Sequence, residues 1–133
     1  LTQEEKEAQI LWFGQFNDTL ACAYLALNEL DKACLSGSNS VQAYEHMDEE
    51  ASKNRYHEHS IVSNNYGKCL LAAGKYESAQ AVIEKSIELL SHIDEAERHP
   101  WHNRLLEESS VLYKLACTGG SVEQITDLNQ SNI

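Results

Sequence analysis

Residues 66–79 read YGKCLLAAGKYESA, and this stretch decides the fold that we expect for the chain. Its first half is rich in Leu, Ala and Lys, which lose little conformational freedom in a helix. Gly74 follows this half, and glycine readily adopts the left-handed conformation of the residue that closes many helices. Beyond it, apolar residues recur at helical spacing, at Tyr76, Ala79, Ile83, Ile87 and Leu90. The stretch therefore predicts two helices joined by a short turn.

The same pattern recurs on both sides of this stretch. A shift of 46 residues superposes the three turn residues Asn28, Gly74 and Gly120. It also superposes apolar or small residues of the flanking helices: Leu20, Tyr66 and Leu112; Leu30, Tyr76 and Val122; Ala33, Ala79 and Ile125; and Val41, Ile87 and Ile133. We therefore expect one all-α domain over residues 1–133, built from three stacked antiparallel helix-turn-helix units at about 4–50, 54–98 and 100–133. An unrelated helical bundle with coincidental spacing is the alternative.

Helix ends are marked at several other points of the chain. Breaks are expected near Asn28, at residues 52–54, near Pro100 and at residues 118–121, which gives six helices. Pro100 suits the first turn of a helix, where its missing N–H is not needed. The second helix is the weakest of the six, because residues 36–40 (SGSNS) form a poor helical run that can bend or fray.

Residues 66–79, continued through Ile83 and Ser86 to Leu89, resemble the tetratricopeptide repeat (TPR) family. Tyr66 and Gly67 match the leucine and glycine of its first helix, Gly74 and Tyr76 match its turn and the aromatic beyond it, and Ala79 matches its close-packed alanine. The first unit matches more loosely through Leu20, Ala21, Tyr24, Leu30 and Ala33, and the third through Leu112, Gly120 and Val122.

The chain departs from the TPR pattern in three respects. Ser63 replaces the family's tryptophan, Ser91 replaces its closing proline, and the period exceeds the usual repeat of about 34 residues. The resemblance implies a right-handed superhelix of antiparallel helix pairs whose first helices line a concave, peptide-binding groove. Composition and periodicity alone indicate only a helical repeat, with a HEAT-like array as the competing architecture.

The family's groove positions fall on six polar side chains of this sequence that we expect to bind a peptide: Asp18, Asn64, Asn65, Lys68, Ser110 and Lys114. Asn64 and Asn65 are poor helix formers in mid-helix, and an Asn amide can both donate to and accept from a peptide backbone. Lys68 and Lys114, one repeat apart, could bind a ligand carboxylate. Asp18 and Cys22 stand where chaperone-binding relatives carry a basic residue and an asparagine, so chaperone tails are not expected ligands.

Charge and cysteine usage narrow the class of partner. The formal net charge is -11, with 21 acidic against 10 basic residues, which disfavours direct binding to nucleic acid or to an anionic membrane. Cys22, Cys34, Cys69 and Cys117 stand singly in apolar helical patterns, and we expect reduced core residues of a cytoplasmic protein. No run is long and apolar enough for a transmembrane helix, and no signal peptide is recognisable.

No motif of a catalytic, cofactor or metal site is recognisable. The chain has neither a Gly-x-Ser-x-Gly elbow nor a phosphate-binding glycine loop, so we expect no enzyme and no cofactor. His57 and His59 would point about 200° apart on a helix. No Cys or carboxylate pattern completes a site around them or around the His99 and His102 pair, so no metal is expected.

We therefore expect a protein- or peptide-binding TPR-like module. Because the chain begins at Leu1 rather than Met, we interpret it as a fragment of a larger protein, such as the sensing or recruitment domain of a bacterial regulator. The alternative is a structural domain that self-associates through apolar residues near its two ends, at Leu11, Trp12, Ile125, Leu128 and Ile133.

Overall fold

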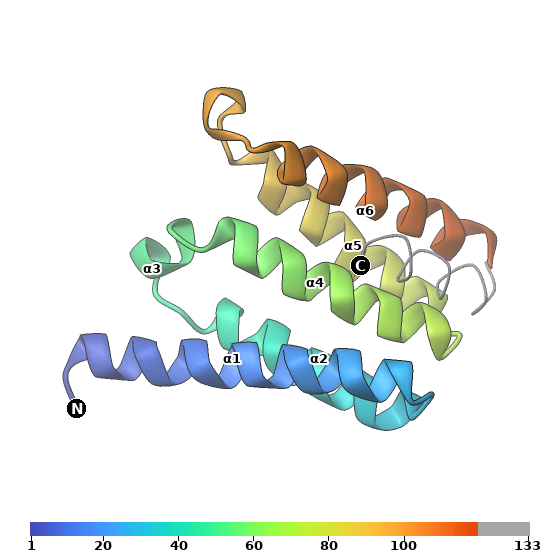
Figure 1. Cartoon of the computed structure of the whole chain (residues 1–133), viewed down its shortest axis with the longest axis horizontal. Coiled ribbons are helices and arrows are strands. Elements are labelled where there is room, and N and C mark those ends of the chain that lie inside the picture. Colours follow the sequence, from blue (N-terminus) through green and yellow to red (C-terminus); the bar gives the residue numbers. More distant parts are fainter. Residues whose placement is uncertain (120–133) are drawn as a thin grey trace.

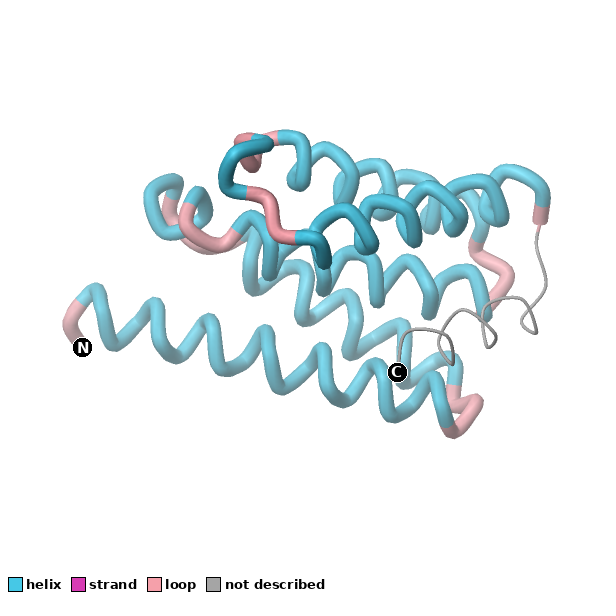
Figure 2. The backbone as a smooth tube through the Cα atoms, turned by 45° about the horizontal axis from the view of Figure 1, so that its top comes forward, coloured by secondary structure: helices cyan, strands magenta, loops and turns pink. Residues whose placement is uncertain are grey.

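The computed structural model describes residues 1–119, and in this part of the chain only helices, loops and turns are present (Figure 2). In chain order the elements are α1 (Gln3–Ala26), α2 (Leu30–Glu45), α3 (Glu49–Lys53), α4 (Tyr56–Ala72), α5 (Tyr76–Ser91), a 3-10 turn (Glu95–Glu97) and α6 (Pro100–Thr118). The expected all-α class is confirmed, and Pro100 opens α6 as predicted. The helix expected after Gly120 lies outside the described residues.

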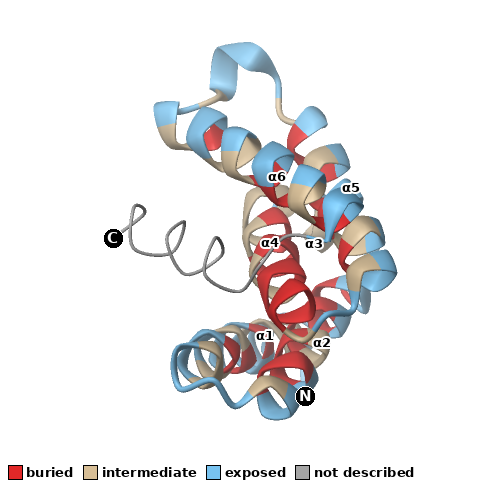
Figure 3. Ribbon diagram, turned by 90° about the vertical axis from the view of Figure 1, so that its right-hand side faces the viewer, coloured by how far each residue is buried: buried red, intermediate tan, exposed pale blue. Residues whose placement is uncertain are grey.

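The helices pack as two antiparallel hairpins followed by a single helix (Figure 1). The first hairpin is α1–α2 and the second is α4–α5; α6 packs on both helices of the second. Helix α4 lies at the centre and contacts α1, α2, α5 and α6. Figure 3 shows the consequence for burial, because α4 is the most buried helix and contributes Cys69, Leu70 and Leu71 to the main core.

Both hairpins close with the same backbone turn. Asn28 (φ 58°) and Gly74 (φ 75°) adopt the left-handed conformation. The residue after each donates its N–H across the turn, from Glu29 to the Tyr24 carbonyl and from Lys75 to the Leu70 carbonyl, at 2.9 Å in both cases. This is the hydrogen bond of a Schellman helix end. The left-handed residue that closes α6 is Gly119 (φ 70°), one position before the Gly120 of the 46-residue shift.

Small residues allow α4 to approach its neighbours closely. A Cβ on Gly37 of α2 would lie 2.7 Å from the Tyr66 ring, and a Cβ on Gly67 would lie 2.6 Å from Ile83 of α5. Contacts below about 3 Å do not occur between real carbon atoms, so the helices can sit this close only because both positions are glycine.

The serine-rich segment of α2 neither bends nor frays, contrary to the possibility raised by its composition. Ser36, Gly37 and Ser40 are buried, and the Ser40 hydroxyl donates to the Gly14 carbonyl of α1 at 2.7 Å. Tertiary packing therefore overrides the poor helical propensity of the run.

Two helix ends fall earlier than the expected units imply. Helix α2 ends at Glu45 rather than near residue 50, and a separate short helix, α3, begins after Asp48, whose carboxylate accepts from the Ala51 N–H at 2.8 Å. Helix α5 ends at Ser91, and residues 92–99 form a loop with the 3-10 turn. The Asp48 cap is the sequence signal that separates α3 from α2.

The cysteines are only partly core residues. Cys34 and Cys69 are buried as expected, but Cys22 and Cys117 are exposed, and all four are free thiols. Burial raises the pKa of the Cys69 thiol to about 12. The expectation of a core position was wrong for Cys22 and Cys117, which the packing of α1 and α6 leaves exposed.

Candidate functional site

The structure places the six predicted binding residues on three helices that pack side by side. Asp18 lies on α1; Asn64, Asn65 and Lys68 lie on α4; Ser110 and Lys114 lie on α6. Helices α1, α4 and α6 run along one side of the molecule with α2 and α5 behind them (Figure 3). We call this side the first-helix face.

Asn65 and Asp18 join α1 to α4. The Asn65 side-chain amide Nδ2 donates to Asp18 Oδ1 at 3.0 Å and approaches Oδ2 at 3.4 Å. Burial raises the pKa of Asp18, while the Asn65 hydrogen bond and the Lys68 charge act in the opposite direction. The Asn65 side chain is half-buried, and its carbonyl Oδ1 accepts no hydrogen bond from residues 1–119. Within the described residues, one half of this amide is thus fixed while the other has no hydrogen-bond partner.

Asn64, Lys68 and Glu108 join α4 to α6. Asn64 is 1% exposed; its Nδ2 donates to Glu108 Oε1 at 3.1 Å, and its Oδ1 accepts from the Ser109 hydroxyl at 3.0 Å. The Lys68 ammonium, 7% exposed, forms an ion pair with the same Glu108 carboxylate. Both amide atoms of Asn64 and the Lys68 charge are therefore engaged between the helices, which fixes α6 on α4.

The two predicted residues of α6 are exposed. The Ser110 hydroxyl donates to the Leu106 carbonyl within its own helix at 2.9 Å. Lys114 forms no ion pair with the residues that the structure describes. Val111 lies next to Ser110 and is 42% exposed, so this part of the face offers a cation beside apolar surface.

The sequence-based prediction missed Glu108, which lies in the middle of the α4–α6 contact. Its pairing with Lys68 and Asn64 spans 40 and 44 residues of sequence, so it depends on how α4 and α6 are rotated against each other. No spacing within a single helix signals such a contact. The nearest clue is Ser109, whose small buried side chain marks the side of α6 that faces α4.

His57 is partly exposed and His59 is 4% exposed, in keeping with their expected divergence on one helix. Among residues 1–119 there is no group of three or more His, Cys, Asp or Glu side chains that could hold a metal ion.

Comparison with known proteins gave no match, whether with protein-family models, with curated proteins or with solved structures. Within the described residues, none of the helices has both the length and the apolar character that crossing a bilayer requires.

Proposed function

We propose that this chain is a TPR-like helical-repeat module that binds a peptide or a protein segment on its first-helix face. As part of a longer protein, such a module would act in sensing or recruitment, for example in a bacterial regulator, and it would not itself be an enzyme. The proposal rests on the likeness between the two hairpins and on the Asn65 side-chain amide, of which only the Nδ2 group is hydrogen-bonded within the described residues.

The likeness extends to buried hydrogen bonds. Ser40 of α2 donates to the Gly14 carbonyl of α1, and Ser86 of α5 donates to the Ser60 carbonyl of α4 at 3.0 Å. Donors and acceptors are each 46 residues apart, the same shift that relates the turns at Asn28 and Gly74. A repeated turn together with a repeated interhelical bond supports a repeat origin of the two hairpins.

The observation that carries the binding proposal is the half-bonded amide of Asn65. Asp18 holds its Nδ2 in place, so the orientation of the amide is fixed before any ligand arrives. Its Oδ1 can then accept a backbone N–H of an extended peptide regardless of the peptide's side chains. Lys114, exposed on the same face, would supply a cation for an acidic group of that peptide.

The test is a selection of peptides from a random display library with the wild-type domain, followed by calorimetry on the enriched sequences. Asn65→Leu should lower the affinity by about tenfold, because one hydrogen bond to a polar peptide group is lost and its partner is left unsatisfied. Asn39→Leu is the matched control, since Asn39 lies on α2, outside the first-helix face, and is half-buried like Asn65. Equal loss in both variants, or no loss in Asn65→Leu, contradicts the proposed site.

Self-association is the second candidate, and one observation favours it. Trp12 and Phe16 of α1 are 64% and 48% exposed, and their rings stack with centroids 5.2 Å apart. Residues 8–17 carry no charge, so two copies of this acidic chain could meet there without carboxylate repulsion. Leu11 is half-buried against the core and does not add to this surface, whereas Ile125, Leu128 and Ile133 lie outside the described residues.

Sedimentation equilibrium at rising protein concentration tests this candidate. Phe16→Glu should convert a dimer to a monomer, and Leu35→Glu, a change at a leucine of α2 that is 64% exposed, should leave the dimer intact. A wild-type chain that stays monomeric throughout excludes self-association.

A further inference from the structure

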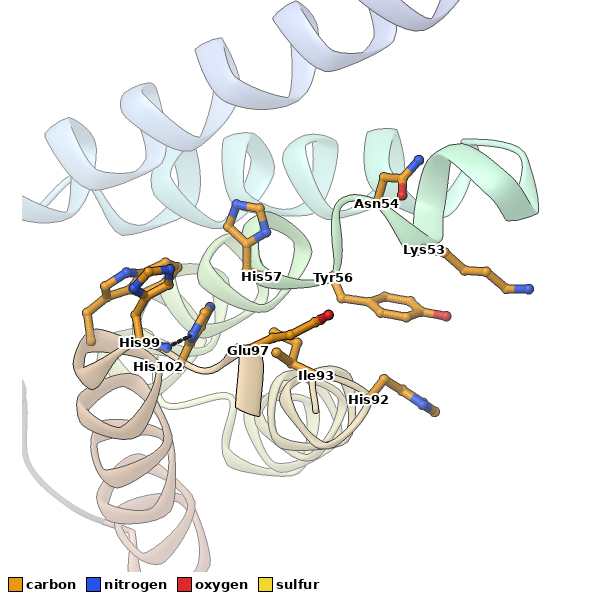
Figure 4. A pocket seen from close by; sticks show the side chains of 10 residues that line it. Lys53, Asn54, Tyr56, His57, His92, Ile93, Glu97, His99 and His102 are labelled. Atoms are coloured by element: carbon orange, nitrogen blue, oxygen red, sulfur yellow. Dashed lines mark hydrogen bonds between the residues drawn. The ribbon is translucent and has the colours of Figure 1, made fainter. Parts of the chain in front are cut away.

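A pocket of about 560 Å³ lies at the end of the molecule where α4 and α6 begin and α3 and α5 end (Figure 4). Histidine and aromatic side chains dominate its walls: Tyr56, His57, His92, His99, Trp101 and His102. They come from segments up to 46 residues apart in the sequence, and none of them is among the six residues predicted to bind a peptide.

His102 brings a buried donor without an acceptor to this pocket. Its Nδ1 accepts the His99 backbone N–H at 2.8 Å, so the neutral ring carries its proton on Nε2. His102 is 6% exposed, and Nε2 has no hydrogen-bond partner among the described residues. Figure 4 shows the ring directed toward His57, whose ring centroid lies 6.3 Å away. A buried N–H in this position favours a ligand that supplies an oxygen acceptor.

Arg98 and the start of α4 favour an anionic acceptor beside His102. The pKa of His102 is lowered by burial and, beyond that, by the charges of His99, His57 and Arg98. Helix α4 points its amino end at the pocket, and no side chain caps that end. Unbonded N–H groups at a helix start attract anions.

Acidic groups near the pocket only partly cancel its attraction for an anion. Glu58, in the first turn of α4, accepts hydrogen bonds from Arg55 at 2.8 Å and from the Tyr44 hydroxyl at 3.2 Å. Lys53 at the pocket rim pairs with Glu49 at 3.5 Å. Among the described residues, Glu97 is the carboxylate that lines the pocket itself.

Flat rings on opposite walls favour a planar ligand. Trp101 packs on His102 with ring centroids 3.8 Å apart, and Tyr56 stacks on His92 with centroids 5.1 Å apart. In Figure 4 the His99 and His102 side chains lie on one side of the pocket and Tyr56 and His92 on the other. We propose that this pocket binds a small aromatic carboxylate, which accepts the His102 Nε2–H with its carboxylate and packs its ring against Trp101.

Tryptophan fluorescence tests this site directly. Trp12→Phe leaves Trp101 as the sole tryptophan of the chain, and this variant is titrated with benzoate, with benzamide and with inorganic phosphate. Benzoate should change the emission saturably, while benzamide, which keeps the ring but not the charge, and phosphate, which keeps the charge but not the ring, should bind about tenfold more weakly or not at all. No saturation by benzoate up to its solubility limit, or equal binding of benzamide, overturns the proposal.

Two variants of the Trp12→Phe protein assign the donor. His102→Met keeps a long side chain at this position but removes the Nε2–H from the pocket, so benzoate affinity should fall by about tenfold. His46→Gln, a change at the exposed histidine that follows α2, should leave benzoate binding as before. If circular dichroism shows that His102→Met does not fold, the nitrogen NMR signal of His102 Nε2 is followed in the Trp12→Phe protein instead; it should move as benzoate saturates, and an unmoved signal contradicts the assignment. Unchanged benzoate affinity in the folded variant contradicts the assignment.

Discussion

His59 is a buried histidine without hydrogen-bond partners, and replacing it by phenylalanine should remove an acid sensitivity of the fold. The His59 ring is 4% exposed and stacks on Tyr44 with centroids 5.7 Å apart. Neither ring nitrogen has a partner among the described residues. Burial, with a smaller contribution from the Lys85 charge, lowers the pKa of His59 from 6.5 to about 4.

The sign of the effect follows from which state binds the proton. Between pH 6.5 and about 4 the unfolded chain takes up a proton on His59 that the folded chain does not. The stability contributed by neutral His59 is therefore fully present above pH 6.5 and is lost as the pH falls toward 4. At pH 5 the loss amounts to about 2 kcal/mol, since each pH unit within this window corresponds to about 1.4 kcal/mol.

Urea denaturation followed by circular dichroism at pH 7.5 and pH 5.0 measures this loss. At pH 7.5, His59→Phe should be at least as stable as the wild type, because phenylalanine has a similar shape and buries no unsatisfied nitrogen. At pH 5.0 the variant's advantage should widen by about 2 kcal/mol. His46→Phe, at an exposed histidine, should follow the wild type at both pH values. A difference between His59→Phe and wild type that does not change with pH would refute the reasoning.

Three further changes test the packing around α4. Gly67→Ala places a Cβ 2.6 Å from Ile83 and should lower the free energy of unfolding measured by thermal denaturation by about 1–3 kcal/mol. The double variant with Ile83→Ala should lose less than the sum of the two single losses, and strictly additive losses would contradict this contact. Lys68→Met removes the cation paired with the Glu108 carboxylate and should lower the free energy of unfolding measured in urea by about 3 kcal/mol, part of which Glu108→Gln should restore. An unchanged unfolding free energy in Lys68→Met would show that the pair contributes nothing. Gly74→Ala forces alanine into a left-handed conformation and should cost about 1–2 kcal/mol, with Gly74→Asn costing less; equal costs would count against strain at the turn.

Local signals predicted the helices around the middle unit well. Gly74 closes α4 with a left-handed residue, Pro100 opens α6, and Ala33 and Ala79 are both fully buried. These features depend on backbone preferences and on residue size, which are known from the residue types alone. The sequence alone could not predict that α2 continues through its serines, because this depends on how closely Gly37 packs against the Tyr66 ring of α4.

The chemistry of the site depended on contacts between helices and was harder to predict. Asn64 and Lys68 are polar and were expected to face a ligand, yet both are buried against α6, where Glu108 is their partner. Their role depends on how α6 is rotated against α4, and the residue periodicity within a single helix does not predict that rotation. The pocket around His102 likewise joins three separate stretches of the chain, 53–57, 92–93 and 97–102.

Mapping a selected peptide on the isotope-labelled domain by NMR is the most direct test of the central claim that the first-helix face binds a peptide. The largest shift changes on titration should fall on Asn65 and its neighbours in α4, with further changes on α1 and α6. Changes confined to α2 and α5, or to the Trp12 and Phe16 surface, would contradict it.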